Sequence, residues 1–494
     1  MSKITIEELE NYLWGSAVLL RTHIDAGSYK QYVFPLLFFK RLCDVYDEEC
    51  SDALVEYGSD EDALGWEEIH SFSIPDGAHW NDVRNKSENV GKAIVDAFRA
   101  IEKANSEKLH GIFGDASWTN KNRLPDRLLR DLIEHFSSLT LSLKNCPEDE
   151  LGQGYEYLIK KFADDSGHTA QEFYTNRTVV HLMTDMLMPE SGESIYDPTC
   201  GSAGMLISCI AYLKEEKKEW RNVSIYGQEI NQLTSSIGRM NLFLHGVKDF
   251  EIINDDTLKN PAFIENGKLK TFDLVLANPP YSIKQWDRAA FEADKYGRNF
   301  LGTPPQGRAD YAFFQHILRS LDEKTGRCAI LFPHGVLFRN EEKEMRARLV
   351  DTDLIECIIG IGENLFFNSP MEACIVICKS EKPVKRRGRI LFINAKNEVT
   401  RKNAQSFLES QHIRRISNAY KNYVTEEGFS AIATLDQIRS NDCKLSIPLY
   451  VSNNGDDGNI EKNYDIENSI SEWKDAVISF QEVDSMFRGV ISGE

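Results

Sequence analysis

The chain has 494 residues, of which 41% are hydrophobic, and a formal net charge of −20. This length predicts about three domains with sizeable cores. No apolar run approaches the roughly 20 residues that a membrane helix needs and the N-terminus is polar, so we expect a soluble, cytoplasmic protein without a membrane partner. The 10 cysteines include no Cys-x-x-Cys pair, which argues against both a metal site and a disulfide framework.

Residues 1–150 are predicted to form an N-terminal helical domain. Apolar residues recur at helical spacing with charges between them, and segments rich in Gly, Ser, Asp and Asn separate these stretches. The expected helices span residues 6–21, 29–55, 88–104 and 126–139. Because no residue pattern here indicates chemistry, we interpret this part as a packing or assembly domain.

Residues 151–400 are predicted to form an α/β domain. Helices are expected at residues 151–163, 179–188, 205–214, 232–243 and 311–321. Short apolar strands are expected at residues 194–196, 224–226, 272–276, 328–332, 354–361, 373–378 and 390–393. Their alternation indicates a parallel, doubly wound, Rossmann-like sheet. The sheet should end in antiparallel strands, because residues 378–390 are too few for a crossover helix.

Residues 401–494 predict a C-terminal extension of mixed and helical structure. A helix is expected at 404–423 and an amphipathic helix at 469–487, with a Gly/Asp/Asn-rich linker at 452–461. This extension is neither basic nor clearly a domain of its own.

A glycine turn follows the first strand of the α/β domain. Asp197 ends that strand, and Gly201 and Gly204 come just before a helix. Glycines allow the backbone to approach a ligand closely, and ligands of doubly wound sheets bind at the carboxyl ends of the strands. Asp197 can accept a hydrogen bond from a cationic amine. Alone, the pattern also fits an ordinary strand–helix turn.

Polar residues follow the neighbouring strands. Glu229 ends the second strand, where an acidic residue can bind ribose hydroxyls. Asp256 follows the third strand region and could accept from an adenine amino group. Upstream, Thr175 precedes a helix, where it could donate to a ligand carboxylate with help from the helix N-terminus or simply cap the helix.

The strongest motif is Asn278-Pro279-Pro280-Tyr281, directly after an apolar strand. The Asn278 side-chain oxygen and the Pro279 carbonyl can accept both hydrogens of an aromatic amino group, which favours a pyramidal, nucleophilic nitrogen. The prolines fix the backbone and remove competing N–H donors. Tyr281 offers a face for stacking a base. The pattern therefore predicts methylation of an amino nitrogen, against the alternative of a rigid turn.

A base within duplex DNA must be flipped out before its amino group can reach a buried methyl donor. Phe366 and Phe367 could form a second aromatic wall around that base, or pack in the core. The polar segment 298–308 is interpreted as a lid that contacts DNA. The densest basic cluster, 382–389, could bind phosphates or form a solvated hairpin tip.

Together these motifs resemble the modification (methyltransferase) subunit of type I restriction–modification systems, an N6-adenine DNA methyltransferase family. The resemblance covers nearly the whole chain and is carried by residues 29–44, 173–175, 197–202, 278–281, 310–316 and 364–367. Two positions depart from the family pattern. Asn176 stands where the family usually has proline, and Tyr281 is often phenylalanine there, which preserves stacking.

The resemblance implies a Rossmann-like S-adenosylmethionine-dependent methyltransferase with S-adenosyl-L-methionine as cofactor. It implies that the cofactor is held by Phe173, Tyr174, Thr175, Asp197, Thr199, Gly201, Ser202, Gly204, Glu229, Asp256 and Thr257. Such subunits work as two copies with one specificity subunit that reads double-stranded DNA, and a restriction subunit can join them. A separate chain that recognises DNA fits the negative net charge, since proteins that bind DNA without a partner usually carry a basic face.

Two alternatives remain open from the residues. Methyltransferases of protein glutamine or of RNA share the tetrapeptide, although the long helical N-terminal domain argues against them. A cofactor-binding assembly subunit without catalysis is the other alternative, and the intact Asp197, Glu229, Asn278 and Tyr281 argue against it.

Overall fold

The computed structural model describes residues 4–57, 69–165, 175–365, 372–402 and 405–451. These residues belong to one compact unit that ends at Val451. Phe173, Tyr174, Phe366, Phe367 and the expected helix at 469–487 lie outside the described residues. Within the described ranges, no helix is both long and apolar enough to cross a membrane.

The N-terminal part is helical, as predicted. Its helices are α1 (Ile6–Leu20), α2 (Lys30–Tyr57), α4 (Trp80–Arg84), α5 (Val90–Ala104), α6 (Ser106–Leu109), α7 (Asp126–Phe136) and α8 (Glu148–Asp165). Thr5 begins α1 through a capping box with Glu8. Phe39 and Phe98 are buried where these helices pack, with ring centroids 5.5 Å apart. Aromatic burial of this kind dominates the energetics of a helical core.

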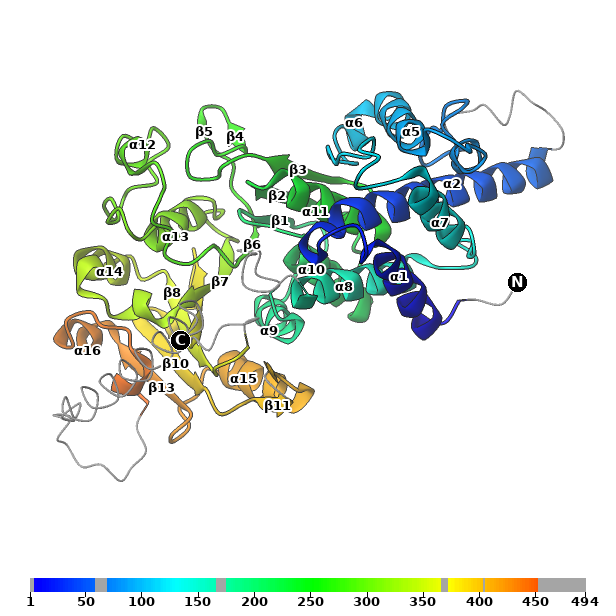
Figure 1. Ribbon diagram of the computed structural model, residues 1–494. Coiled ribbons are helices and arrows are strands. Elements are labelled where there is room, and N and C mark those ends of the chain that lie inside the picture. Colours follow the sequence, from blue (N-terminus) through cyan, green and yellow to red (C-terminus); the bar gives the residue numbers. More distant parts are fainter. Residues whose placement is uncertain (1–3, 58–68, 166–174, 366–371, 403–404, 452–494) are drawn as a thin grey trace, which may run out of the picture. The chain divides into compact units, whose positions relative to one another are not determined.

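A nine-stranded sheet forms the centre of the α/β part of the described chain (Figure 1). Its order is β13-β10-β8-β9-β7-β6-β1-β2-β3. The strands are β1 (Ser194–Asp197), β2 (Ser224–Glu229), β3 (Phe250–Asn254), β6 (Leu274–Ala277), β7 (Arg327–Pro333), β8 (Ile355–Ile361), β9 (Ala373–Lys379), β10 (Arg389–Ala395) and β13 (Ser430–Thr434). All neighbours are parallel except the pairs of β9 with β7 and β8 and the pair of β10 with β13.

The far end of the sheet differs in part from the sequence prediction. β9 is antiparallel, as expected, but β10 does not pair with it, because β8 lies between them and runs parallel to β10. The predicted helix 404–423 is also wrong in its first part, where β12 (Gln405–Phe407) pairs with β11 (Thr400–Lys402), and α15 covers only Ser410–Asn422. The structure of these segments is determined by which strands pair with each other, and the spacing of apolar residues in the sequence does not show that pairing.

Helices cover both faces of the sheet. Successive residues of a strand point to opposite faces, so neighbouring residues pack under different helices. Ile195 packs in the core under α9 (Arg177–Leu187), α10 (Gly204–Glu215) and α15. Tyr196 packs on the other face under α13 (Asp310–Arg319), α14 (Lys343–Asp351) and α16 (Leu435–Ser440). The remaining elements are α12 (Arg288–Glu292) and the hairpin of β4 (Ile264–Glu265) and β5 (Lys268–Leu269).

Helix α11 (Gln232–Leu244) belongs to two structural neighbourhoods. It connects β2 to β3, yet its residues Ile237, Met240 and Leu244 are buried in the core of the N-terminal helices. The Tyr155 hydroxyl of α8 donates to the Ile237 carbonyl oxygen at 3.1 Å. The helical region and the sheet are therefore joined by a shared apolar core within one compact unit.

This shared core predicts one cooperative unfolding transition for residues up to 451. Phe38 is buried against Phe113 and against Phe243 of α11, with ring centroids 5.9 Å and 6.0 Å apart. Phe38→Ala should cost about 3–5 kcal/mol and lower the temperature of the whole transition in calorimetry. Val55→Ala is the control, because Val55 is 88% exposed and should shift nothing. A second transition that keeps its wild-type temperature in the Phe38 variant would contradict the shared core.

Candidate active site

The order of the sheet reverses at β1. From β1 the chain proceeds outward to β2 and β3 and then returns to β6 on the other side of β1 (Figure 1). In open α/β sheets, the crevice at the carboxyl ends of the strands at such a reversal is where ligands bind. Asp197 ends β1 and Asn278 follows β6, so the structure brings the glycine turn and the tetrapeptide to the same crevice.

The glycine turn after β1 is fixed by two carboxylates. Asp197 is buried, and its Oδ1 accepts from the Thr199 backbone N–H at 2.9 Å. Gly201 has a φ of +52°, which glycine adopts without strain, and its N–H donates to Glu229 Oε2 at 3.1 Å. Glu229 Oε1 also accepts from the Asn231 N–H at 2.8 Å. Glu229 therefore connects the end of β2 to the turn after β1.

The residues after β3 mainly stabilise their own turn. Asp256 Oδ1 accepts from the backbone N–H groups of Leu258 and Lys259 at 2.9 and 3.1 Å. The buried Thr257 hydroxyl donates to the Pro198 carbonyl oxygen at 2.5 Å. Thr257 thus ties this turn to the glycine turn, a structural role that the sequence did not reveal.

The Asn278 side chain is oriented by a residue far away in sequence. Its Nδ2 donates to Thr175 Oγ1 at 3.0 Å, whereas its Oδ1 is buried with no hydrogen-bond partner among the described residues. A buried acceptor without a partner is costly, and such atoms in native sites often await a ligand donor. Thr175 does not cap α9; Asn176 does, accepting from the Thr178 N–H at 3.0 Å.

A buried ion pair holds the backbone just after the tetrapeptide. Ser282 has a φ of +50°, and its N–H donates to Asp310 Oδ1 at 2.9 Å. Asp310 is 1% exposed, and Arg339 donates to its Oδ2 at 2.9 Å. Tyr281 lies between Asn278 and this clamp. It is half-buried, and burial of its hydroxyl raises its pKa well above the usual range.

The segment 298–308 is anchored to the loop after β3. Arg298 is buried and donates to the carbonyl oxygens of Thr257 and Leu258, each at 2.9 Å. Asp294 pairs with the same guanidinium at 2.7 Å. Further along, the Trp286 indole N–H donates to the Gln306 carbonyl oxygen at 2.8 Å. Neither Arg298 nor Asp310 could be assigned these partners from spacing, because both contacts join separate loops.

A small cavity of about 50 Å³ lies among these motifs. It is lined by Thr175, Arg177, Asp197, Thr199, Cys200, Gly201, Ser202, Gly204, Met205 and Asn278. Ligand sites usually enclose several hundred Å³. The described residues therefore enclose only a fraction of the volume of a usual ligand site.

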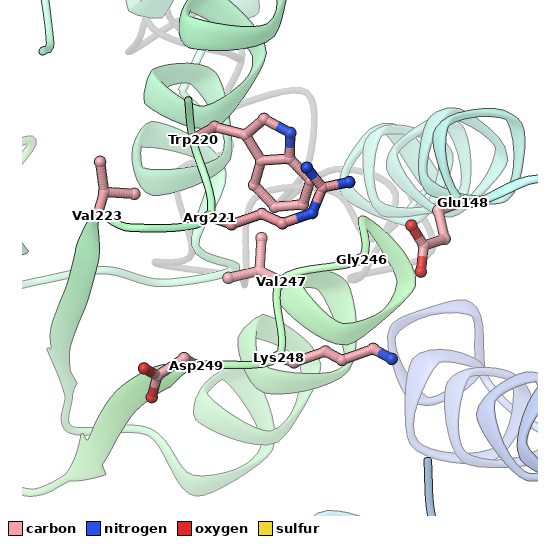
Figure 2. A pocket seen from close by; sticks show the side chains of 8 residues that line it. All are labelled: Glu148, Trp220, Arg221, Val223, Gly246, Val247, Lys248 and Asp249. Carbon is pink, nitrogen blue, oxygen red and sulfur yellow. The ribbon is translucent and has the colours of Figure 1, made fainter. Parts of the chain in front are cut away.

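A larger cavity of about 410 Å³ lies at the opposite edge of the sheet, before β2 and β3. Figure 2 shows Trp220 and Arg221 on one side of it and Glu148 of α8 on the other. Lys248 and Asp249 complete its polar lining. None of the motif residues that the structure describes lines it, so the smaller cavity at the carboxyl ends of the strands is the candidate active site.

The buried Asp197 predicts a pH-dependent stability. Burial raises its pKa from 3.8 to about 7, and the negative charge of Glu229 adds to the rise. Between these pH values the folded chain keeps a proton that the unfolded chain releases, so this contribution to stability is lost as pH rises toward 7. Asp197→Asn should therefore gain melting temperature relative to wild type as the pH rises from about 4 to about 7, and the gain should level off above that.

Asp322→Asn is the matched control for this measurement. Backbone hydrogen bonds from Thr325 and Lys324 lower the pKa of Asp322, so its contribution is present at neutral pH and lost in acid. Because that loss falls below about pH 4, the melting-temperature difference of this variant should stay constant between about pH 4 and pH 7 and change only in stronger acid. A difference independent of pH for Asp197→Asn would show that its carboxyl is ionised throughout.

Comparisons with known proteins show the family to which the chain belongs. The family model for N-6 DNA methylases matches residues 147–457, and the model for the HsdM N-terminal domain matches residues 9–136. The type I restriction enzyme MjaVIII methylase subunit of Methanocaldococcus jannaschii is 32% identical over 473 residues, covering 92% of this chain and 79% of that protein. The HindI methylase subunit of Haemophilus influenzae is 31% identical over 404 residues, covering 78% of this chain and 88% of the relative.

A solved structure shows the same fold over nearly the whole chain. The type I restriction-modification system methyltransferase subunit from Streptococcus thermophilus has a TM-score of 0.80 and 30% sequence identity, covering 91% of this chain and 100% of that one. Both the helical region and the α/β region therefore have counterparts in the same class of proteins. The chain belongs to the N-6 DNA methylase family, as an adenine-N6 DNA methyltransferase subunit of the type I restriction–modification class.

Proposed function

We propose that the cavity binds the methionine end of S-adenosylmethionine and that the residues Asn278 to Tyr281 present the N6 amino group of a flipped-out adenine to it. The observation that carries this proposal is the buried Asn278 Oδ1, which lacks a donor among the described residues while Thr175 holds the other end of the amide. An amino group supplies the missing donor.

The residues around the cavity fit this cofactor. Asp197 is an acceptor for the methionine ammonium group, and a cation beside it would favour the ionised carboxylate. Gly201 and Gly204 leave room for a close approach to the backbone. Thr175, Thr199 and Ser202 contribute polar groups to the same lining. When bound, S-adenosylmethionine supplies an electrophilic methyl group on a sulfonium.

Outside the cavity, Glu229 at the end of β2 is placed for the ribose hydroxyls. Asp256 and Thr257 would border the adenine ring of the cofactor. Phe173 and Tyr174 are proposed to complete the site on the strength of the family motif.

The tetrapeptide activates the nitrogen by holding its hydrogens. Asn278 Oδ1 and the Pro279 carbonyl accept one N–H each, which directs the nitrogen lone pair toward the methyl group. No strong base is required before transfer, because the nitrogen gains a positive charge and then releases a proton. Tyr281 stacks on the flipped adenine, and Phe366 and Phe367 are proposed as the opposing wall.

We propose that another chain chooses the DNA site. The net charge is −20, and residues of the densest basic cluster, 382–389, form hydrogen bonds and ion pairs within the chain. Lys382 donates to Asp353 at 2.6 Å, and Arg386 donates to Glu356 at 3.0 Å. Proposed partners are double-stranded DNA, a specificity subunit bound partly through the extension after residue 400, a second copy of this chain and a restriction subunit.

Asn278→Ala should lower the rate constant for methyl transfer at least about 100-fold, since it removes an acceptor that acts on the reacting nitrogen. The dissociation constant for S-adenosylmethionine should change by less than about threefold. Transfer of a labelled methyl group to DNA, with a specificity subunit present, and calorimetric titration measure the two quantities. Asn122→Ala, on an exposed turn, is the matched control. Adenine methylation at the wild-type rate in the Asn278 variant would exclude the proposed mechanism.

Asp310→Asn tests the clamp behind the tetrapeptide. It removes the negative charge that lies nearest to Arg339, leaving Glu342 at 3.6 Å as the other acidic neighbour, and it weakens the hold on Ser282. We expect kcat to fall about 10- to 100-fold while KM for S-adenosylmethionine stays within about twofold, because the clamp contacts the base side only. A lower melting temperature with unchanged kcat would reduce Asp310 to a purely stabilising residue.

A further inference from the structure

Among the described residues that line the candidate active site, Arg177 is a cation whose task the family motifs leave open. Arg177 is the first residue of α9 and lines the same cavity as Asp197 and Asn278. Its side chain is 23% exposed and forms an ion pair with Glu156 of α8, whose side chain is 18% exposed. A partly desolvated guanidinium fixed in this way is suited to binding a carboxylate.

Two neighbours fix the position of the Arg177 guanidinium. Glu156 accepts a hydrogen bond from its Nη2. Asn241 Nδ2 lies 3.3 Å from Glu156 Oε1 and also donates to the Ser202 carbonyl oxygen at 2.9 Å. On the other side, the guanidinium lies directly on Gly204, in the space that a Cβ atom would fill. The cation is therefore placed at the start of α10 rather than extended into solvent.

The charged residues that line the cavity are complementary to the ammonium and carboxylate groups of an amino acid. Among the cavity's described lining residues, Arg177 supplies a positive charge, and Asp197 supplies a negative charge when a cation lies beside it. Helices α9 and α10 both begin here, and helix N-termini favour an anion. A methionine moiety carries one ammonium and one carboxylate, which are the two complementary charges.

We infer that Arg177 binds the carboxylate of the methionine part of S-adenosylmethionine, an inference that rests on the proposed function. The sequence suggested that Thr175 binds this carboxylate, but its hydroxyl oxygen accepts a hydrogen bond from Asn278, and the inference assigns the carboxylate to Arg177 instead. It also gives Gly204 a specific reason to be glycine, since any larger side chain would displace the cation.

The test compares S-adenosylmethionine with its decarboxylated form, which differs only by the carboxylate. The wild-type chain should prefer the carboxylated ligand about 10- to 100-fold in calorimetric titration, the range expected for hydrogen bonds to a charged group. Arg177→Met should bind the two ligands with equal affinity, while its affinity for the decarboxylated form stays within about twofold of wild type. Arg221→Met is the matched control, since Arg221 is exposed at the opposite edge of the sheet.

Gly204→Ala provides a second variant that keeps the arginine. Its methyl group would overlap the guanidinium, which is the end of a flexible side chain and can move without unfolding the helix. This variant should also lose the preference for the carboxylated ligand, with a melting temperature close to that of wild type.

The outcomes separate the inference from the proposed function. If the wild-type chain does not bind S-adenosylmethionine at all, both are overturned. If it binds and Arg177→Met keeps the wild-type preference for the carboxylate, only the inference is overturned. Loss of DNA affinity with the ligand preference intact would likewise overturn it, by showing that Arg177 binds a phosphate of DNA instead.

Discussion

The hydrogen bond from Asn278 Nδ2 to Thr175 Oγ1 is the contact on which the active site depends. It joins two residues 103 positions apart and fixes which end of the amide faces the cavity. Three consecutive residues then serve different parts of the site. Thr175 orients the Asn278 amide, Asn176 caps α9, and Arg177 lies on Gly204. The start of α9 therefore relates the proposed base side of the site to the proposed cofactor side, and a shift of one residue there would misplace both.

Behind the site, buried charges hold the loops in place. Asp310 and Arg339 fix the backbone at Ser282, and Arg298 holds the carbonyl oxygens of the turn after β3. Buried ion pairs contribute little net stability compared with apolar packing, because desolvating the charges is costly. Their value here is geometric, since each one specifies the path of a loop that has no regular secondary structure.

Much of the fold and the centre of the site could be predicted from the sequence. Alternating helical and strand patterns indicated the parallel sheet, and polar residues at strand ends indicated the crevice that holds Asp197 and Asn278. The contacts of Arg298 could not be predicted, because they join loops that no periodicity relates. The place of β10 beyond β8, and the role of α11 in the helical core, were missed because both depend on packing between segments distant in sequence.

Helix α11 has a consequence for how the chain responds to its partners. One part of it is buried among the N-terminal helices, and Gly238 packs so closely that an added Cβ would lie 2.7 Å from the Gly201 carbonyl oxygen. A partner that binds the helical region and moves α11 therefore changes the shape of the glycine turn, which is proposed to receive the cofactor. By thermodynamic linkage, cofactor binding then alters the affinity for that partner by the same factor. Assembly of the complex and loading with the methyl donor would be coupled equilibria, communicated by a single helix.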